Sequence, residues 1–513
     1  MKYIGRMTNS LFLVSLFIAA INLYGYLYIG PIQKFKSSIM NMKDCGIGAQ
    51  QLQDAFYARA YSVYYLWCTK KSFEFRNYLS VTSVIKHMDP DKVVLFYKDY
   101  PVVDPRIYNI WLDEILQKYP YLETVKVPDT VCKTNDSSTQ NFVSAYLKGF
   151  EGIQWEEHTM LTSQLTKTDA SDVITNRKKF FARCSSASSV KGEASLPLCI
   201  VLDRSFYPKD IWNLDTPFGR STRRLFYGVD EIRNLVPSYC QLAPNIAHIM
   251  WVGGGEMDFL FYLSILSLIH VAEVDKVFIY GEAPTGFYWS LLQNNSKVKV
   301  VRHALVERIY GKPIKSLVHM GDILRVEILK RYGGIYLDTD AVVVKPFQRE
   351  IRAYDAVVSL DGMASMFLPF PDVINNGVMI GKKYAKFWDI FQESMKDFID
   401  DDYTYNGVRR SYQILERHPD VIHVDPRLQV ICYLRQCHPT WWPGYHNSSL
   451  HHLSSNIKFD WKNDAYVIHW TTSPAELLDP KLLLNSTGMF AEIGKYILEK
   501  SNMTQYFCNS TKT

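Results

Sequence analysis

The chain has 513 residues, of which 47% are hydrophobic and 21% charged, a composition that is ordinary for a globular protein. This length allows two or three domains, each with its own hydrophobic core. The formal net charge of +5 is spread along the chain without a basic block, which argues against nucleic acid as a main partner.

An apolar stretch at residues 11–29 is nearly long enough to span a bilayer as a helix. We interpret it as a signal-anchor transmembrane helix, with residues 1–10 as a cytosolic tail and residues 30–60 as a stem. A cleavable signal peptide is the alternative interpretation of the same stretch. Lysines follow it as well as precede it, so the positive-inside rule leaves the orientation open.

Six N-x-S/T sequons follow the apolar stretch and favour a luminal, glycosylated body. They begin at Asn135, Asn294, Asn447, Asn485, Asn502 and Asn509. Nine cysteines fit the same oxidising compartment, and Cys432 and Cys437 are plausible disulfide partners across a short loop. The expected protein is therefore anchored in a membrane, with most of the chain on the luminal side.

Beyond the stem, strand-like and helix-like segments alternate, which is typical of an α/β fold. Residues 92–97 (KVVLFY) and 276–280 (KVFIY) are short apolar runs suited to a covered parallel sheet. Residues 319–332 carry apolar side chains at helical spacing, and Gly333 and Gly334 follow as a stop signal.

The chain contains an internal repeat. Shifted by 184 positions, residues 67–97 align without a gap on residues 251–281, with ten identities in 31 positions. We infer a duplication, with a degenerate first module at residues 61–240 and a complete second module at 241–485, followed by a glycosylated tail at 486–513. Two ordinary βαβ units with coincidental identities are the alternative.

The repeat also explains why only one site is expected. With gaps, residues 199–208 (CIVLDRSFYP) align with residues 335–346 (IYLDTDAVVVKP). In this alignment the first module has Asp203-Arg204-Ser205 where the second has an Asp-Thr-Asp sequence, so it lacks the second carboxylate.

Asp338 and Asp340 follow an apolar strand in the segment GGIYLDTDAVVV. Open α/β sheets bind ligands at the carboxyl ends of their strands, and strand positions two apart point to the same side. Two carboxylates that face one spot repel each other unless a cation lies between them, and Mn²⁺ or Mg²⁺ takes oxygen ligands. For an isolated D-x-D sequence, however, a turn with each Asp capping a neighbouring amide is the better interpretation.

The flanking sequence favours a site. Asp322 and Arg325 share one face of the expected helix that precedes the strand, so they can border the same pocket, although a surface ion pair is the alternative. Upstream, residues 245–253 form an expected first strand that ends in Trp251 and a glycine-rich loop. Trp251 is suited to stacking on a base, although a lone tryptophan is more often a core residue.

Together these residues resemble the D-x-D sugar transferases, which include α-1,4-galactosyl-, α-1,4-N-acetylglucosaminyl- and fungal α-1,6-mannosyltransferases. The resemblance lies in I-x-x-x-W-x-G followed by D-x-x-R-x-x-x-L-x-x-Y-G-G-x-Y-x-D-x-D, and it covers about residues 245–385. It implies a GT-A fold with a Rossmann-like nucleotide-sugar-binding domain, a nucleotide-sugar donor that we expect to be UDP-linked, Mn²⁺ or Mg²⁺ as the metal, and retention of anomeric configuration.

The resemblance also implies roles for individual residues. Asp338 and Asp340 would bind the metal, and His469 could be a further ligand, although a satisfied core histidine is as plausible. The expected catalytic residues are Asp322, Arg325, Asp338 and Asp340. The expected donor-binding residues are Trp251, Asp322, Arg325, Tyr336 and Asp338. The expected acceptor-side residues are Asp361 and Asn376.

The expected function is therefore that of a Golgi type II membrane glycosyltransferase that acts on a glycan or glycolipid and works as a monomer or as a homo- or hetero-oligomer. No carboxylate is placed convincingly as a nucleophile, so we favour attack from the leaving-group side. A non-catalytic luminal pseudoglycosyltransferase or sugar-binding partner is the alternative. A hydrolase is disfavoured, because glycosidase carboxyls flank the bond from opposite sides.

Overall fold

The computed structural model describes residues 62–67, 70–88, 90, 92–128, 152–155, 159–161, 184–186, 199–201, 205–304, 306–361, 367–432, 460–470 and 479–509. The expected anchor and stem, the sequons at Asn135 and Asn447, and Cys437 lie outside the described residues. Within the described ranges, no helix is both long and apolar enough to cross a membrane.

The first module is built on a parallel four-stranded sheet in the order β3-β2-β1-β4. Its strands are β1 (Ser62–Trp67), β2 (Lys92–Tyr97), β3 (Leu122–Lys126) and β4 (Gly152–Trp155). Its helices are α4 (Phe75–Met88), η1 (Pro105–Ile107), α5 (Trp111–Lys118), η4 (Pro208–Ile211) and α9 (Pro217–Phe226). A small separate sheet has the order β5-β7-β6, with β5 (Thr159–Leu161), β6 (Cys184–Ser186) and β7 (Cys199–Val201).

The second module contains a mixed seven-stranded sheet in the order β10-β9-β8-β13-β16-β15-β17, in which β16 runs antiparallel to both of its neighbours. Its strands are β8 (Ile246–Trp251), β9 (Lys276–Gly281), β10 (Val298–Val301), β13 (Gly334–Leu337), β15 (Ala356–Leu360), β16 (Ile374–Gly381) and β17 (His423–Val424). A second sheet has the order β14-β19-β18, with β14 (Ala341–Val343), β18 (Gln429–Cys432) and β19 (Val467–Trp470). A short β11 (Arg308–Ile309) pairs with β12 (Lys312–Pro313).

Helices pack on these sheets, whose central strands β8, β13 and β16 are almost entirely buried. Helix α10 is buried along almost its whole length and packs next to β14, where the Val343 amide donates to the Ser267 hydroxyl at 2.9 Å. The helices are α10 (Phe259–His270), α11 (Gly286–Leu292), α12 (Leu317–Tyr332), α13 (Arg349–Arg352), α14 (Lys386–Ser394), η6 (Met395–Asp397), η7 (Tyr405–Arg409), α15 (Arg410–Arg417), α16 (Trp461–Asp464), α17 (Pro480–Asn485), α18 (Met489–Lys500) and α19 (Thr504–Asn509).

The two repeat segments have the same local structure. β1 and β8 begin and end at positions 184 apart, as do β2 and β9. Their registers also agree, because Ser62 pairs with Lys92 as Ile246 pairs with Lys276. In both helices a serine hydroxyl donates to the serine carbonyl three residues earlier: Ser83 to Ser80 in α4, and Ser267 to Ser264 in α10. These matches support the duplication, whereas the module boundaries stay a prediction.

One part of the predicted alignment is wrong. The strand beside β1, in the place that β13 takes beside β8, is β4 and not β7. β7 pairs instead with β5 and β6 in a different sheet. The apolar sequence of β7 did not reveal which strand it pairs with, because a short apolar run is compatible with any buried position in a sheet.

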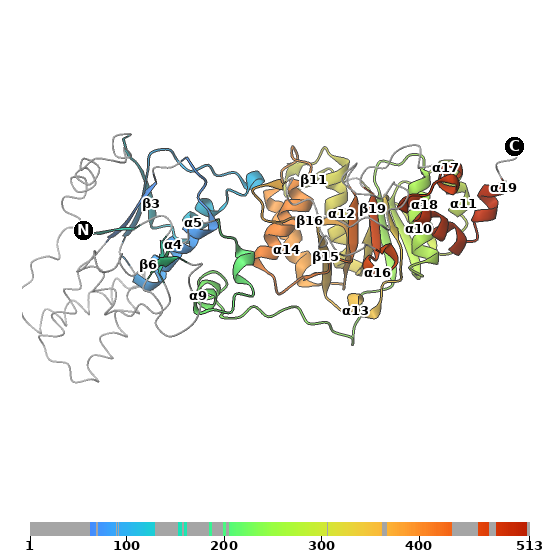
Figure 1. Ribbon diagram of the computed structural model, residues 1–513. Coiled ribbons are helices and arrows are strands. Elements are labelled where there is room, and N and C mark those ends of the chain that lie inside the picture. The colour runs from blue at the N-terminus through green and yellow to red at the C-terminus, as the bar shows by residue number, and fades with distance from the viewer. Residues whose placement is uncertain are drawn as a thin grey trace, which may run out of the picture.

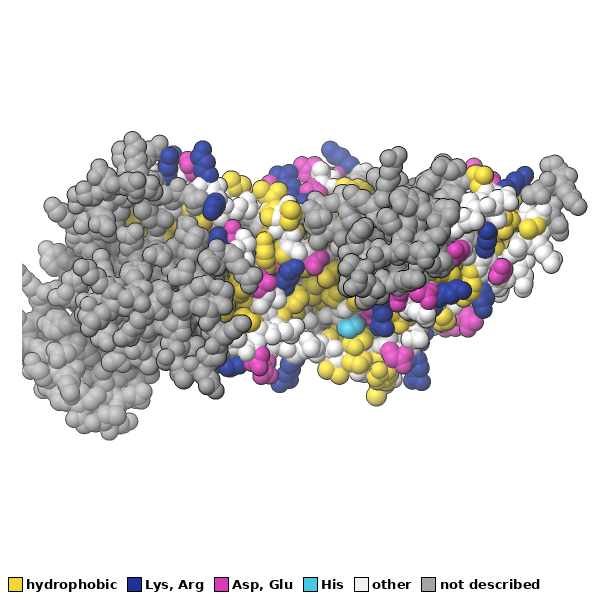
Figure 2. All heavy atoms as spheres, in the orientation of Figure 1, with side chains coloured by type: hydrophobic (Ala, Val, Ile, Leu, Met, Phe, Trp, Pro, Cys, Tyr) yellow, Lys and Arg dark blue, Asp and Glu magenta, His cyan; other side chains and the backbone are white. Residues whose placement is uncertain are grey.

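One of the two hydrophobic clusters of the described residues spans both modules. This cluster of buried residues runs from β1 and α4 of the first module into α12, β16 and α14 of the second. Figure 1 shows the first module at the blue end, next to the part of the second module that contains α14. On the face seen in Figure 2, basic and acidic side chains of the second module are interspersed.

Candidate active site

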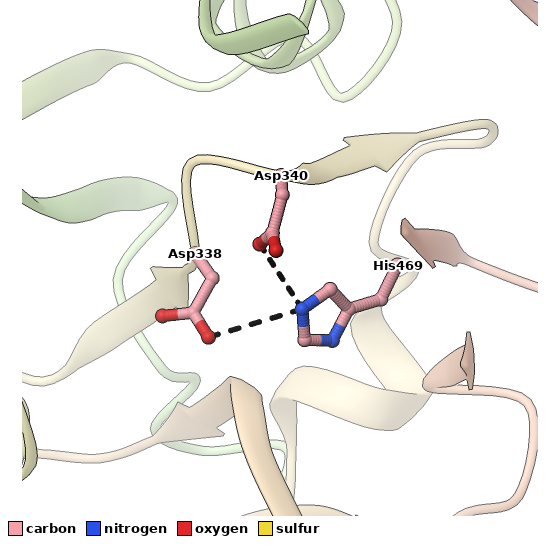
Figure 3. Close-up of side chains that lie close together, drawn as sticks. All are labelled: Asp338, Asp340 and His469. Carbon is pink, nitrogen blue, oxygen red and sulfur yellow. Dashed lines mark hydrogen bonds and ion pairs between the residues drawn. The ribbon is translucent and has the colours of Figure 1, made fainter. Parts of the chain in front are cut away.

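Asp338 and Asp340 lie in a tight turn that connects the two sheets of the second module. β13 ends at Leu337, the Asp338 amide donates to the Gly377 carbonyl at 2.8 Å, and the Ala341 amide donates to the Asp338 carbonyl at 3.2 Å. The expectation that both aspartates point together because a strand alternates is therefore wrong. They converge because the chain turns from β13 into β14, as Figure 3 shows.

His469 reaches the same turn from β19. The antiparallel ladder places it opposite Ala341, and the Trp470 amide donates to the Asp340 carbonyl at 3.0 Å. Its Nε2 lies 3.0 Å from Asp340 Oδ1 and 3.9 Å from Asp338 Oδ2 (Figure 3). One atom from each of the three side chains lies within 4.8 Å of the others, so the structure brings the three expected metal ligands together.

Gln429 and Gly377 hold the imidazole in this orientation, and the sequence analysis missed both. Gln429 Nε2 donates to the Asn375 carbonyl at 2.8 Å, which leaves its Oε1 3.2 Å from His469 Nδ1. With Nδ1 donating to that oxygen, Nε2 points at the two carboxylates. A Cβ at position 377 would lie 2.3 Å from His469 Cε1, so only glycine allows this approach.

Asp322 and Arg325 lie on one face of α12 and are buried, at 5% and 7% exposure, so they do not form a surface ion pair. Arg325 Nη2 lies 3.5 Å from Asp322 Oδ1 and 3.6 Å from Asp338 Oδ1. Its Nη1 donates to the Asn376 carbonyl at 2.7 Å, and its guanidinium lies 4.5 Å from the centre of the Tyr336 ring. A fixed positive charge therefore stands beside the aspartate turn.

The other expected donor residues lie around this group. The Tyr336 hydroxyl donates to Asp338 Oδ1. Trp251 is at the end of β8, the strand next to β13, and its ring packs on Phe261 at 4.8 Å between ring centres. Trp251 is half-buried, and its Nε1 has no hydrogen-bond partner among the described residues.

The two expected acceptor-side residues differ in what they contact. Asn376 Nδ2 donates to the Gly407 carbonyl of η7, while its Oδ1 is buried and has no partner among the described residues. Asp361 accepts from Asn375 Nδ2 at 3.2 Å and is itself buried. Asn376 thus presents an unused acceptor, whereas Asp361 supports the neighbouring asparagine.

Burial and mutual charge shape the protonation of this group. Burial raises the pKa of Asp338, the Arg325 charge lowers it in part, and the Asp340 charge raises it further. Burial also raises the pKa of Asp322, against the opposing charge of Arg325. For His469 burial lowers the pKa, but the carboxylates of Asp340 and Asp338 outweigh it, so the pKa is raised. Several raised pKa values in one buried cluster are typical of functional sites.

The donor set fits a divalent cation. Two carboxylates and an imidazole nitrogen offer both hard oxygen ligands and one softer ligand, which suits Mn²⁺ better than an ion that prefers oxygen alone. A cation between Asp338 and Asp340 would also remove the repulsion that raises the pKa of Asp338.

Tyr403, which lies in the chain between α14 and η7, was not predicted as a site residue, and its side chain is 67% exposed. Burial raises the pKa of its hydroxyl, and the charges of Asp338 and Asp322 raise it further. No sequence pattern identifies Tyr403, because its loop meets α12 only in the folded chain.

Comparisons with known proteins give a family match for the segment that contains the aspartate turn. Residues 234–358 match the family described as glycosyltransferase sugar-binding region containing DXD motif. Glucan organizing enzyme 1 of Cryptococcus neoformans var. grubii serotype A is 26% identical over 220 residues, which are 42% of this chain and 57% of that protein. The chain thus spans little more than half the length of this curated relative.

Several solved glycosyltransferase structures are similar at low identity. The galactosyltransferase LgtC, solved with donor and acceptor sugar analogues, is 12% identical with a TM-score of 0.29, over 50% of this chain and 95% of that one. GlyE of Streptococcus pneumoniae TIGR4 is 11% identical with a TM-score of 0.30, over 52% of this chain and 63% of that one. The family match covers the segment that carries the aspartate turn, so this segment is similar to the DXD-containing sugar-binding region of glycosyltransferases.

Proposed function

We propose that this protein is a metal-dependent, retaining glycosyltransferase that moves a hexose or N-acetylhexosamine from a nucleotide sugar, UDP-linked, to a glycan or glycolipid. The observation that carries the proposal is the convergence of Asp338, Asp340 and His469 beside the buried Asp322–Arg325 pair. Separate elements supply these side chains, and an aspartate turn with only a structural role needs neither the histidine nor the buried arginine.

Charge stabilisation is the main contribution of the site. Asp338, Asp340 and His469 would hold Mn²⁺, which supplies positive charge for the diphosphate of the donor when it is bound. Arg325 adds a second positive charge that cannot move away, because Asn376 and Tyr336 fix its guanidinium. Fixed charge of this kind stabilises a leaving diphosphate without reorganisation during the reaction.

Asn376 is the candidate for the sugar itself. A buried acceptor without a donor costs free energy, and a sugar hydroxyl would satisfy Asn376 Oδ1. The carboxylates near it are engaged: Asp322 and Asp338 with Arg325, and Asp340 with His469. None of these three is free to attack the anomeric carbon, which supports entry of the acceptor hydroxyl on the leaving-group side.

The proposed location is the Golgi membrane, with a single type II anchor at residues 11–29 and the catalytic part in the lumen. The support comes from the apolar stretch and the sequons. Asn294, Asn485 and Asn502, the sequon asparagines whose side chains are described, are all exposed.

A donor panel tests the proposed activity. The full-length chain would be incubated with UDP-Gal, UDP-GlcNAc, UDP-Glc or GDP-Man, with and without Mn²⁺, and free nucleotide measured. We expect Mn²⁺-dependent release from one donor. A glycan array with that donor would then identify the acceptor, and glucan oligosaccharides belong on it because of the name of the fungal relative. Binding of UDP with Mn²⁺ but no release from any donor would favour the non-catalytic alternative.

A further inference from the structure

Residues 399–409, here called the wall segment, contain η7, which packs on β16 and α12 beside the site. Gly407 packs so closely on Asp322 that a Cβ at position 407 would lie 2.8 Å from Asp322 Oδ1. The Gly407 carbonyl accepts the hydrogen bond from Asn376 Nδ2. The wall segment therefore fixes the rotamer of Asn376.

The wall segment has a π-helical turn, η7, which leads directly into α15. A π-helical turn is less stable than an α-helix and is frequent at functional sites. Contacts inside the second module hold part of this segment: Asp400 accepts from His319 Nδ1 at 2.9 Å, and Asn406, in η7, accepts from the Ile399 amide at 3.0 Å. Arg410, the first residue of α15, pairs with Asp397. The first module adds support to η7 and α15 from outside.

The first module supplies that support through Tyr108. The Tyr108 hydroxyl lies 2.7 Å from both carboxyl oxygens of Glu416, a residue of α15 that is fully buried. Burial raises the pKa of Glu416 to about 8, against the opposing effects of Tyr108 and Arg417. A neutral carboxyl explains the two short contacts, because one oxygen accepts from the phenol and the protonated oxygen donates back to it.

Further contacts join the same elements. Arg409 Nη1, in η7, donates to the Arg106 carbonyl of η1, while Arg409 Nη2 donates to Thr404 Oγ1 at 2.7 Å. Arg417, at the end of α15, pairs with Glu114 of α5. Tyr108 itself has a left-handed backbone, with φ of 63°, a conformation that costs free energy for a residue with a side chain.

We infer that the first module is a positioning element of the active site, because Tyr108, through Glu416, and Arg106, through Arg409, hold the wall segment against Asp322 and Asn376. These are positioning residues that touch neither the expected metal ligands nor the expected donor residues. The inference rests on the proposed transferase function, since the wall segment is taken to border the bound sugar. It gives the first module a task in catalysis that needs no second active site.

The test compares two hydroxyl deletions in the full-length chain. Tyr108→Phe removes the contact to Glu416 but keeps the ring, which packs on Phe370 at 4.8 Å and on Trp111 at 5.8 Å. Tyr78→Phe is the matched control: its ring lies 5.5 Å from the same Trp111, and its hydroxyl contacts Lys118 within the first module. Both variants lose a buried hydroxyl from one aromatic cluster, but only the first loses a contact to the second module.

The test uses two readouts. The first is the kinetics of nucleotide release, given by kcat and by KM for the donor. The second is amide hydrogen exchange in peptides that cover residues 399–409. We expect Tyr108→Phe to lower kcat about tenfold, the rate equivalent of one hydrogen bond, with donor KM unchanged and faster exchange in the wall segment. Tyr78→Phe is expected to match the wild type in both. Glu416→Gln, which keeps an acceptor for Tyr108, is expected to retain kcat.

Equal kcat and equal exchange in Tyr108→Phe and Tyr78→Phe would overturn the inference. Tenfold loss in Glu416→Gln would contradict the neutral hydrogen bond as the link between the modules. If the wild type releases no nucleotide, the proposed function fails, yet the exchange readout still decides the inference about position: faster exchange only in Tyr108→Phe supports it, and equal exchange contradicts it.

Discussion

The backbone at Gly377 decides how closely His469 approaches the aspartate turn. Gly377→Ala would place a Cβ 2.3 Å from His469 Cε1 and push the ring away from Asp340. Because a displacement of about 1 Å can cost about 100-fold in rate, we expect Mn²⁺-dependent nucleotide release to fall by about that factor, with weaker Mn²⁺ binding by calorimetry.

Gly494→Ala is the matched control for this steric change. A Cβ at position 494 would lie 2.3 Å from Leu483 Cδ1, in the packing of α18 on α17. It should lower the melting temperature without changing Mn²⁺ affinity. Unaltered Mn²⁺ affinity in Gly377→Ala as well would show that His469 is not a ligand.

Gln429 has a measurable effect on the metal although it is not itself an expected ligand. Gln429→Leu removes the oxygen that accepts from His469 Nδ1 at 3.2 Å and frees the imidazole to change tautomer. Loss of such a partner typically costs 10–100-fold in metal affinity, so we expect at least about a tenfold weaker Mn²⁺ affinity, measured by electron paramagnetic resonance titration. The same affinity as the wild type would contradict the orientation assigned to His469.

At the scale of elements, the sequence indicated α12 and the strand after it well. The helical spacing of residues 319–332 and the two glycines that follow identified both elements to within a few residues. The prediction was wrong at the two aspartates, because it assumed that the strand, with side chains alternating between its two faces, continued beyond Leu337, where β13 ends. A turn between two sheets leaves no periodic trace, so only the structure shows why Asp338 and Asp340 converge.

Residues that contact the site from outside the motif were harder to predict than the motif residues themselves. Asp322, Arg325 and Tyr336 belong to one continuous string of sequence. Gln429, in contrast, reaches the site from a strand far along the chain. Tertiary packing alone brings such residues in, and a single sequence carries no signal for it.

Helix α15 makes the stability of the molecule depend on pH. Because Glu416 has its pKa raised from 4.5 to about 8 in the folded chain, the folded state binds more protons than the unfolded state between these values. Stability is therefore highest below the unfolded pKa and falls as pH rises towards about 8, by about 1 kcal/mol per pH unit. Tyr108, Arg417 and Lys209 act on Glu416 in the opposite sense to burial.

The comparison of wild type with Glu416→Gln isolates this effect. Melting temperatures from pH 5 to pH 8 should fall more steeply for the wild type, so that the variant becomes relatively more stable at the alkaline end. Parallel profiles for the two proteins would show that Glu416 does not change its protonation across this range in the folded state.

At the scale of the whole molecule, the repeat was visible in sequence because its strands and helix kept their lengths. The offset of 184 positions matches the bounds of β1 with β8 and of β2 with β9. The hydrophobic cluster that spans both modules could not be read in the same way, because apolar patterning does not say which surfaces meet.

Luminal exposure of the chain predicts N-glycans at sequons on the described surface. Asn294, Asn485 and Asn502 are exposed, so each should carry a glycan when the chain is expressed through the secretory pathway. Replacing each asparagine by Gln should abolish one glycan-dependent shift in electrophoretic mobility, and treatment of the wild type with N-glycanase should abolish the same shift. Asn295→Gln, beside Asn294 but outside the acceptor position, is the control. Absence of any N-glycanase-sensitive shift would contradict a luminal location.

The central claim is that Asp340 holds the metal with which this protein transfers a sugar. Its most direct test is the rate of Mn²⁺-dependent nucleotide release from the preferred donor, compared between the wild type, Asp340→Ala and Asp355→Ala. Asp355 is the control, because it pairs with Lys382 at 2.9 Å and not with the expected metal ligands. We predict activity in the wild type and Asp355→Ala and at least about a 100-fold loss in Asp340→Ala. Equal release by wild type and Asp340→Ala would contradict the claim.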